Sequence, residues 1–575
     1  MTTQATLAAI VALLLAAGPA RAADGAAATV APSRQQCEGL AARMAAHWPD
    51  ESTRITDVHY HETAEAVSLP MPGGARAEIT VPAHCEIVGA LHERVGALGQ
   101  HYAIHFHLRL PAEWNQRFFF QGGGGTNGDI GNALGLLAVD VGSALASGFA
   151  VVSQDSGHDN ATNRDGARGG LTAFGFDAQA RADYGHASLL PVSQIAKAII
   201  ATYYGAAPRF SYFVGCSKGG EEGMAAAQRY AQEFDGVLAA APGFSLPRAA
   251  MTQAWDVQSF AAATNLTSPA SLADAFSDAD LTLASRAVLA ACDADDGLAD
   301  GIVGAFEQCT QPKVHRELSR LQCSESKTPE CLSAAQITAL ERVYAGPADA
   351  QGRALYSNWP WDAGLASPGW RMWKLGSAGG AMPALNITLG GASLSAVFTV
   401  PPTPLRDDSQ AQLDFVRQFD FERDAPKIYA TNAQFPRSAW DDISARSSNL
   451  SAFRSRRGKL LVPHGVSDPV FSINDTLAWY REVDRRTKGK AATFVRVFPV
   501  PGMAHCGGGP ATDRYDAFGP LVNWVEHGKA PDRIIARAGA ASPWPGRERP
   551  LCPYPKVARY QGTGSPEKAE NFVCR

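Results

Sequence analysis

The sequence predicts an α/β fold in which a parallel sheet is interrupted by one large insertion. Seven short segments are apolar on both faces, which is typical of parallel strands covered by helices. Helical segments alternate with these strands, and such alternation indicates an α/β sheet. The alternation stops between about residues 246 and 455, a stretch rich in Trp, Pro, Gly and Ser. We therefore expect a core in two parts, 23–245 and 456–575, with an inserted domain at 246–455.

The predicted elements follow one another along the chain as short strands separated by helices. The strands span residues 102–110, 117–121, 149–154, 210–215, 236–243, 459–465 and 493–500. The helices span residues 187–205, 219–234 and 474–489. Parallel strands place their carboxyl ends at one edge of the sheet, so we expect the loops after them to build any functional site.

Composition narrows the class of protein. The 575 residues are 46% hydrophobic and 19% charged, which is ordinary for a globular chain. The formal net charge is −5 and no basic cluster stands out, so nucleic acid is not an expected partner.

The N-terminus has the features of an export signal. An apolar run at residues 7–17 is followed by small residues that end at Ala22, which predicts a signal peptide over residues 1–22. The flank before the run carries no Lys or Arg, and the alternative is a short membrane anchor. Because the run is too short to span a bilayer, we expect a periplasmic or secreted protein without stable membrane insertion.

The chain has ten cysteines, and an even set in an exported protein favours disulfides. No C-x-x-C or Cys/His zinc spacing is present. Proximity in sequence suggests the pairs Cys292–Cys309, Cys323–Cys331 and Cys552–Cys574, with Cys37–Cys85 tying down the N-terminal segment. Cys216 and Cys506 remain, far apart in sequence.

A candidate nucleophile lies between the predicted strand FSYFV and the helix after it. Residues 215–219 read G-C-S-K-G and fit G-x-S-x-G, the sharp turn that exposes a nucleophilic serine, here Ser217. The motif alone is common, but its strand–turn–helix context is the one that this chemistry needs. The alternative is an ordinary serine in a strand-to-helix turn.

A nucleophilic serine needs a base and an acid that orients the base, and in this kind of fold they follow it in the order acid, then histidine. Asp468 follows one predicted strand in HGVSD, and His505 follows the next in GMAHC. Asp475 and His464 are the competitors. We expect Asp475 to cap the next helix, whereas His464 either lines the pocket or lies in the core.

An oxyanion hole requires two backbone N–H donors. We assign one to Lys218, directly after the serine, and the other to Gly124 within a window of residues 123–125. This glycine run, in QGGGGTNG, permits backbone geometry that side chains forbid. It lacks the G-K-[ST] ending of a phosphate-binding loop.

The cysteines that remain unpaired lie next to the proposed catalytic groups. Cys216 precedes Ser217 and Cys506 follows His505. If serine and histidine meet, a Cys216–Cys506 disulfide would tie the two loops together. The alternative is two buried thiols.

Together, GCSKGG, HGVSD and the His-Cys pair resemble the tannase and feruloyl esterase family of α/β-hydrolases. That family includes fungal feruloyl esterases, tannases and a bacterial hydrolase of mono(2-hydroxyethyl) terephthalate. The resemblance extends over nearly the whole mature chain, including QGGGGTNG and LCPYPKVARYQG. It implies an α/β-hydrolase core with a large inserted lid domain, a disulfide between the nucleophile and base loops, and substrates that are esters of aromatic acids.

An acidic loop in the lid suggests calcium. Asp293, Asp296 and Asp300 offer carboxylates, and Leu298 and Ile302 offer carbonyls, which are the hard oxygen donors that Ca²⁺ prefers. The loop is not an EF-hand because the terminal Glu is missing. The family resemblance implies a structural calcium at these positions; the alternative is a solvated acidic turn.

The lid also carries the candidate acyl pocket. The resemblance implies that Trp373 and Phe398 flank the stretch that lines this pocket. Terephthalate-cleaving relatives place an arginine there to bind a free carboxylate, but residues 374–397 contain none. This favours a neutral phenolic acyl group, and Lys374 would substitute only as a flexible point charge.

These features predict a serine carboxylesterase that acts on small aromatic esters of the feruloyl or galloyl type. A hydrolase of mono(2-hydroxyethyl) terephthalate or a related ester is the alternative within the same class. A non-catalytic binding protein on a hydrolase fold is the alternative of another class, and the complete set of triad candidates argues against it. The motif alone does not separate an esterase from a peptidase.

Overall fold

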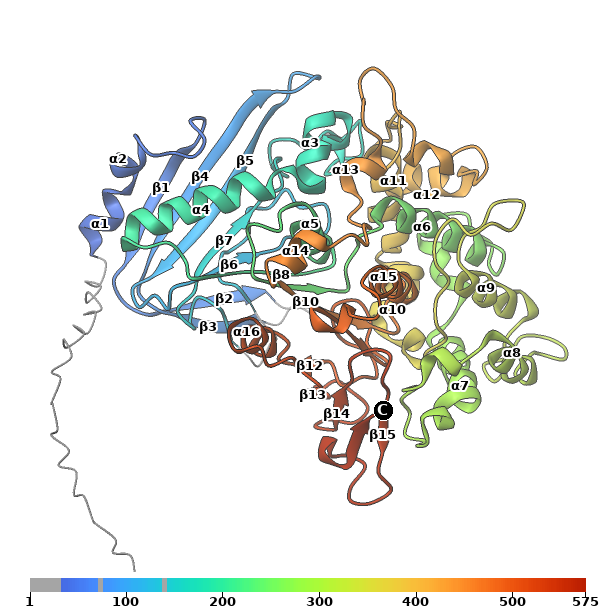
Figure 1. Cartoon of the computed structure of the whole chain (residues 1–575). Coiled ribbons are helices and arrows are strands. Elements are labelled where there is room, and N and C mark those ends of the chain that lie inside the picture. The colour runs from blue at the N-terminus through green and yellow to red at the C-terminus, as the bar shows by residue number, and fades with distance from the viewer. Residues whose placement is uncertain (1–32, 71–75, 137–141) are drawn as a thin grey trace, which may run out of the picture. The chain divides into compact units, whose positions relative to one another are not determined.

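The computed structural model describes residues 33–70, 76–136 and 142–575. The expected signal peptide, residues 1–22, lies outside the described residues. The description below concerns these residues (Figure 1).

A nine-stranded mixed sheet forms the centre of the fold. In spatial order its strands are β1 (Arg54–His61), β4 (His84–Val95), β5 (His101–Pro111), β7 (Ala150–Gln154), β6 (Arg117–Gln121), β8 (Phe210–Cys216), β9 (Gly236–Ala240), β10 (Lys459–Gly465) and β11 (Val495–Val500). The six strands from β7 to β11 run parallel, and β1, β4 and β5 are antiparallel.

One strand departs from the sequence prediction. The predicted segment 102–110 belongs to β5, which pairs antiparallel with β7, Phe106 opposite Gln154. The strand is apolar on both faces because other parts of the protein bury both faces. Such burial occurs in parallel and antiparallel strands alike, so it does not predict the direction of the strand. β1 and β4 were not predicted, because polar side chains interrupt their apolar pattern.

Helices cover both faces of the parallel part of the sheet. Phe118 and Phe120 of β6 point into the core beneath α4 (Leu189–Tyr204), α5 (Lys218–Arg229) and α15 (Ile473–Arg486). Phe119, between them, points to the opposite face and meets Phe518 of α16 (Phe518–His527) edge to face, with ring centroids 5.2 Å apart. The predicted two-sided burial of the strands is therefore present.

The chain between β9 and β10 contains helices and adds no strand to the sheet, which agrees with an insertion at 246–455, although those boundaries stay a prediction. Its helices are α6 (Leu246–Ala261), η4 (Ala270–Ala275), α7 (Asp278–Cys292), η5 (Asp293–Asp296), η6 (Phe306–Gln308), α8 (Gln311–Arg320), α9 (Ala334–Ala345), η7 (Ala363–Ala366), α10 (Pro368–Lys374), η8 (Ala378–Gly380), η9 (Asn386–Gly391), α11 (Ala392–Ala396), α12 (Ser409–Gln418), η10 (Ala425–Ile428), α13 (Ala439–Ile443) and α14 (Ser451–Ser455).

The remaining elements lie near the two ends of the chain and between the early strands. They are α1 (Arg34–Glu38), α2 (Leu40–Met44), β2 (Glu65–Pro70), β3 (Arg76–Val81), η2 (Ala173–Phe176), α3 (Ala178–Ala182), η3 (Asp183–Ala187), η11 (Ala491–Thr493), β12 (Arg514–Tyr515), β13 (Ile534–Arg537), β14 (Glu548–Leu551), β15 (Ala558–Tyr560), η12 (Ala569–Asn571) and β16 (Phe572–Cys574).

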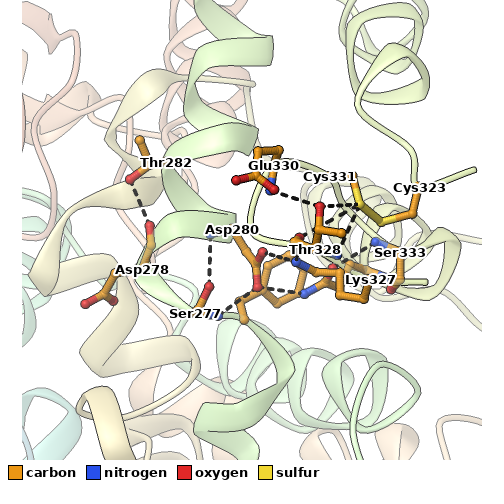
Figure 2. A network of polar contacts seen from close by, with 12 residues as sticks. Ser277, Asp278, Asp280, Thr282, Cys323, Lys327, Thr328, Glu330, Cys331 and Ser333 are labelled. Carbon is orange, nitrogen blue, oxygen red and sulfur yellow. Dashed lines mark hydrogen bonds and ion pairs between the residues drawn. A yellow bond between two sulfur atoms is a disulfide. The ribbon is translucent and has the colours of Figure 1, made fainter. Parts of the chain in front are cut away.

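Polar contacts hold the Cys323–Cys331 loop against the start of α7 (Figure 2). Ser277 caps α7 and forms a reciprocal capping box with Asp280. Lys327 reaches across from the loop and donates to Asp280 Oδ1 at 2.7 Å. One carboxylate therefore serves both the helix start and the disulfide-closed loop.

A buried ion pair joins three helices of the inserted region. Lys374 at the end of α10 contacts Asp256 on α6, and their side chains are 2% and 1% exposed. Asn386 of η9 donates to the same carboxylate at 3.1 Å. The ammonium also lies 4.9 Å from the centre of the Trp359 ring. Lys374 therefore has a structural position and is not free to bind a substrate.

We predict that Lys374→Met destabilises the protein by about 3–5 kcal/mol, because it leaves the Asp256 carboxylate buried without its cation. Urea-induced unfolding measures the change. The double variant Lys374→Met/Asp256→Leu serves as the control and should recover much of the loss. A single variant as stable as the wild type would show that the pair contributes nothing.

Candidate active site

The turn that carries Ser217 joins β8 directly to α5. Ser217 has φ 65° and ψ −120°, a conformation that a residue with a side chain adopts at a cost of about 1–3 kcal/mol. A Cβ on Gly215 would lie 2.5 Å from the Gly219 carbonyl carbon, and one on Gly219 would lie 2.6 Å from Gly123 O. Only glycine fits at both positions, which explains the spacing of the motif.

Hydrogen bonds connect Ser217, His505 and Asp468 in series. Ser217 Oγ lies 2.8 Å from His505 Nε2, and His505 Nδ1 lies 2.8 Å from Asp468 Oδ2. Each residue follows a strand of the parallel part of the sheet: β8, β11 and β10, respectively. The structure thus brings together the three residues that the sequence predicted. The geometry suits proton transfer from the serine hydroxyl to the imidazole.

The environment of Asp468 keeps its carboxyl ionised. Burial acts to raise its pKa, but attraction to His505 and hydrogen bonds from His464 and His505 hold the pKa well below its usual range. The N–H groups of Val470 and Phe471 also donate to Oδ1, at 2.8 and 3.1 Å. An ionised Asp468 accepts a hydrogen bond from His505 Nδ1–H. This fixes the tautomer of the imidazole and so directs the Nε2 lone pair at Ser217.

The two competing residues occupy other places. His464 is fully buried behind Asp468, with Nδ1 2.9 Å from Thr476 Oγ1 and Nε2 3.0 Å from Phe471 O. It does not line the cavity beside Ser217, so the core alternative holds and its assignment to substrate binding is corrected. The expected cap at Asp475 is also wrong. Ser472 caps α15 by accepting from Asn474 N–H, because its backbone is extended, and Asp475 pairs with Arg446 in the first turn.

A cavity of about 180 Å³ opens beside Ser217 and His505. Both expected substrate residues, Trp373 and Phe398, line it, and the Trp373 ring stands edge-on to His505 with centroids 5.9 Å apart. Its other apolar walls are Leu246, Ala250, Leu389, Val470 and Phe471. Thr126, Gln253 and Ser393 add polar groups. Flat aromatic groups suit such walls.

The glycine loop after β6 contributes to the same cavity. Lys218 and Gly125 line it, whereas Gly124 does not. The Gly123 N–H donates to Glu222 Oε2 at 2.8 Å, so that amide is already engaged. Within the window of residues 123–125, the geometry therefore favours Gly125 over the expected Gly124.

The side chain of Lys218 has a role that sequence reasoning missed. It folds beneath the glycine loop, where its ammonium lies 2.5 Å from Glu221 Oε2 and 3.3 Å from Glu222 Oε1. Glu222 Oε1 also accepts from Asn127 Nδ2 at 2.7 Å. These buried charges fasten the loop to α5. The K-x-x-E-E spacing, with partners three and four residues apart on a helix, was the available signal.

All ten cysteines lie within the described residues, and all form disulfides in the expected pairs. The Cys216–Cys506 bridge joins the residue before Ser217 to the residue after His505, with Cα atoms 6.1 Å apart. It spans 290 residues of sequence and holds two loops that must meet.

Some carboxylate oxygens of the acidic loop accept hydrogen bonds from the backbone of the same loop. Asp293 accepts from Gly301 N–H at 2.9 Å, and Asp296 accepts from Gly304 N–H at 3.0 Å. Burial raises the pKa of Asp296 to about 6, and the charges of Asp300 and Asp293 also raise it. This mutual repulsion, together with the all-oxygen donors, fits a hard cation. Asp296, Leu298, Asp300 and Ile302 line one cavity.

Among the described residues, a different cluster has the spacing of a metal site. One side-chain ligand atom from each of His61, Glu65 and His84 lies within 4.8 Å of the other two. The three loop aspartates are more widely spaced. The rings of His61 and His84 stack at 4.2 Å with an interplanar angle of 9°, so their lone pairs do not converge on one point. Arg109 Nη1 also lies 2.5 Å from His84 Nε2. This group therefore does not fit a metal ion.

A strand–turn–helix serine joined through histidine to a buried aspartate, on a largely parallel sheet, defines the class of α/β-hydrolases. Residues 85–575 match the family described as tannase and feruloyl esterase, so the chain belongs to that family and is a carboxylic ester hydrolase.

Relatives agree with this assignment. The chain is 42% identical to a mono(2-hydroxyethyl) terephthalate hydrolase of Piscinibacter sakaiensis, over 94% of this chain and 92% of that protein. It is 28% identical to a probable feruloyl esterase of Arthroderma benhamiae, over 81% of each.

Two solved structures share the fold. Feruloyl esterase B from Aspergillus oryzae superposes with a TM-score of 0.72 at 23% identity, covering 94% of this chain and 99% of that one. The tannin acyl hydrolase from Aspergillus niger gives a TM-score of 0.66 at 20% identity, covering 95% and 96%. Among the described residues, no helix has the length and apolarity needed to cross a membrane.

We predict that replacing both Cys216 and Cys506 with alanine lowers kcat more than it raises KM. The bridge fixes the backbone beside Ser217 and His505, and a displacement of about 1 Å can cost about a hundredfold in rate. Steady-state kinetics measures both parameters. The matched control, Cys323→Ala/Cys331→Ala, opens a bridge in the outer loop of Figure 2 and should leave kcat near the wild-type value. Equal kcat in both double variants would contradict a catalytic role for the Cys216–Cys506 bridge.

Proposed function

We propose that this protein is an exported serine esterase that hydrolyses neutral esters of hydroxylated aromatic acids through an acyl-enzyme. The observation that carries the proposal is the hydrogen-bonded series of Ser217, His505 and Asp468 beside an aromatic-walled cavity. A non-catalytic binding protein would not need this alignment. Five disulfides and the apolar N-terminal run support export, with residues 1–22 as the signal peptide.

In the first half of the reaction, Ser217 Oγ attacks the ester carbonyl carbon while His505 Nε2 takes the hydroxyl proton. The carbonyl oxygen becomes an oxyanion, which accepts hydrogen bonds from the N–H groups of Lys218 and Gly125. The bond from carbon to the alcohol oxygen then breaks, and His505 returns the proton to that oxygen. The alcohol leaves and the acyl group stays on Ser217.

In the second half, water replaces the alcohol. His505 removes a proton from the water as it attacks the acyl carbon, and then delivers that proton to Ser217 Oγ as the acyl–serine bond breaks. Asp468 holds the imidazole in one tautomer and stabilises its charged form throughout. The products are the aromatic acid and the free enzyme.

The charges around the cavity support a neutral acyl group. Residues 374–397 contain no arginine, the Lys374 ammonium is bound to Asp256, and the Lys218 ammonium is bound to two glutamates. A free carboxylate would enter the cavity without a cationic partner, which is costly. The alternative is a hydrolase of mono(2-hydroxyethyl) terephthalate, favoured by the 42% identity to that enzyme. Comparing kcat/KM for methyl ferulate, methyl gallate and mono(2-hydroxyethyl) terephthalate decides between them.

We also propose that the acidic loop binds a structural calcium ion through the carboxylates of Asp293, Asp296 and Asp300 and the carbonyls of Leu298 and Ile302. The resemblance to the family, the all-oxygen donor set and the mutual repulsion of these carboxylates support this site; Asp300 also pairs with Arg549. When bound, the ion supplies charge neutralisation and cross-links the loop. It takes no part in the reaction.

We predict that Ser217→Ala abolishes esterase activity and leaves the thermal unfolding transition near that of the wild type. The change removes one oxygen at a turn and little packing. A nucleophile knockout leaves only what binding and the oxyanion hole provide. Hydrolysis of a chromogenic short-chain ester measures the loss. A variant that keeps more than about a thousandth of wild-type kcat would show that another residue is the nucleophile.

We predict that calcium at about 100 times its Kd stabilises the metal-free protein by about 2.7 kcal/mol, since it binds only the folded state. Thermal unfolding with chelator and with added calcium measures this. Asp296→Asn should lose most of the effect. Asp295→Asn is the matched control and should keep it, because Asp295 pairs with Lys313 and is not a proposed ligand. Equal calcium responses in the two variants would rule out Asp296 as a ligand.

A further inference from the structure

Gln253 carries a buried side-chain carbonyl oxygen that no described protein group satisfies. The residue is 9% exposed, and its Oε1 has no hydrogen-bond partner among the described residues. A buried carbonyl oxygen without a partner costs free energy, and such a group in a native protein calls for an explanation. Gln253 lines the cavity that contains Ser217 and His505, which offers one.

The position of Gln253 along α6 sets how far it lies from the nucleophile. Leu246, Ala250 and Gln253 are spaced four and three residues apart, so one face of α6 lines the cavity. The helix begins close to the nucleophile turn, where Gly243 N–H donates to Ser217 O at 3.2 Å. At a rise of 1.5 Å per residue, Gln253 lies about 10 Å further along the helix axis than Leu246. Of the α6 residues that line the cavity, Gln253 therefore lies furthest along the helix from the nucleophile turn, and we call its side of the cavity the remote end.

The surroundings of the amide are polar but uncharged. Gly390 of η9 approaches it so closely that a Cβ there would lie 1.5 Å from Gln253 Oε1. Ser393 of α11 lines the same cavity. The lysine ammonium groups nearby, those of Lys218 and Lys374, are both bound to buried carboxylates. The remote end of the cavity thus offers hydrogen bonds without offering a charge.

We infer that Gln253 is a specificity-determining residue that hydrogen-bonds a phenolic hydroxyl at the far end of the acyl ring. A carboxamide both donates and accepts, and a phenol does the same, so the two groups are complementary. Trp373 and Phe398 hold the ring between the hydroxyl and the ester. An acyl group without the hydroxyl leaves the amide unpaired, which lowers transition-state binding about tenfold. This inference rests on the proposed esterase function.

The experiment compares kcat/KM for two matched pairs of esters: methyl 4-hydroxybenzoate with methyl benzoate, and methyl 4-hydroxycinnamate with methyl cinnamate. The two pairs differ in the length of the acyl group. For the pair whose acyl group is long enough to reach from Ser217 to Gln253, the wild type should prefer the hydroxylated ester about tenfold in kcat/KM. Gln253→Leu keeps the volume of the side chain but removes both hydrogen-bonding atoms, and should bring this ratio close to one. Gln253→Glu retains an oxygen that accepts from the hydroxyl, and should keep part of the preference.

A matched control lies on the same helix. Gln258 donates to the backbone oxygens of Val416 and Phe419, outside the cavity. Gln258→Leu should lower stability, measured by thermal unfolding, and leave the ratio of the two esters at its wild-type value. A merely structural effect of glutamine replacement would appear equally in both variants, so the ratio separates recognition from packing.

The outcomes distinguish this inference from the function on which it rests. A wild type that hydrolyses both members of each pair with ratios near one overturns the role of Gln253 and leaves the esterase proposal standing. A Gln253→Leu variant that keeps the wild-type ratio does the same. A wild type that hydrolyses none of the four esters overturns both. A preference that disappears in Gln253→Leu and persists in Gln258→Leu supports the assignment.

Discussion

The site depends on one constrained turn, the single residue between the end of β8 and the start of α5. Ser217 is forced to positive φ, and its N–H donates to Ala240 O at the end of β9 at 3.1 Å. Its carbonyl accepts from Gly243 N–H after β9 and from Glu221 N–H in α5. The two bonds with β9 and the segment after it, of about 1 kcal/mol each, offset a conformational cost of similar size. The nucleophile is therefore fixed by β9 and the segment after it as much as by its own motif.

The helices between β9 and β10 join the sheet at two places that serve the site. The segment that contacts Ser217 runs directly into α6, which lines the cavity, and these helices end before β10, whose following loop carries Asp468. The two segments that connect the lid to the sheet are therefore also the segments that position the catalytic groups. Trp359 of the inserted region donates to Asp468 O at 2.8 Å, which adds a direct bond between them. A change in the packing of the lid would therefore shift Asp468 as well as the acyl pocket.

The sequence was informative where one residue type is required and uninformative where only position matters. Ser217, Asp468 and His505 were predicted, because buried strands and the glycine spacing locate them. The disulfide partners were predicted from closeness in sequence and, for Cys216 and Cys506, from their places beside Ser217 and His505. The direction of β5 was not, because two-sided burial looks the same in either orientation. Gly124 and Gly125 have identical local chemistry, so only the backbone path separates them. The partner of Lys374 lies on a different helix, and nothing near Lys374 in the sequence reveals that its charge is matched; for Lys218 the K-x-x-E-E spacing was a signal that the prediction did not use.

Charge matching has a consequence for recognition. Burying an ammonium without a partner is prohibitive, so each lysine near the cavity is paired with carboxylates: Lys218 with two glutamates and Lys374 with Asp256. Once paired, these groups hold the glycine loop and the inserted helices, and both ammonium groups are already engaged by carboxylates. The cavity is left with aromatic surface, a few neutral polar groups and the catalytic histidine. Under the proposed function, such a cavity distinguishes substrates by ring shape and by hydrogen bonding to Gln253, and not by attraction to a charge.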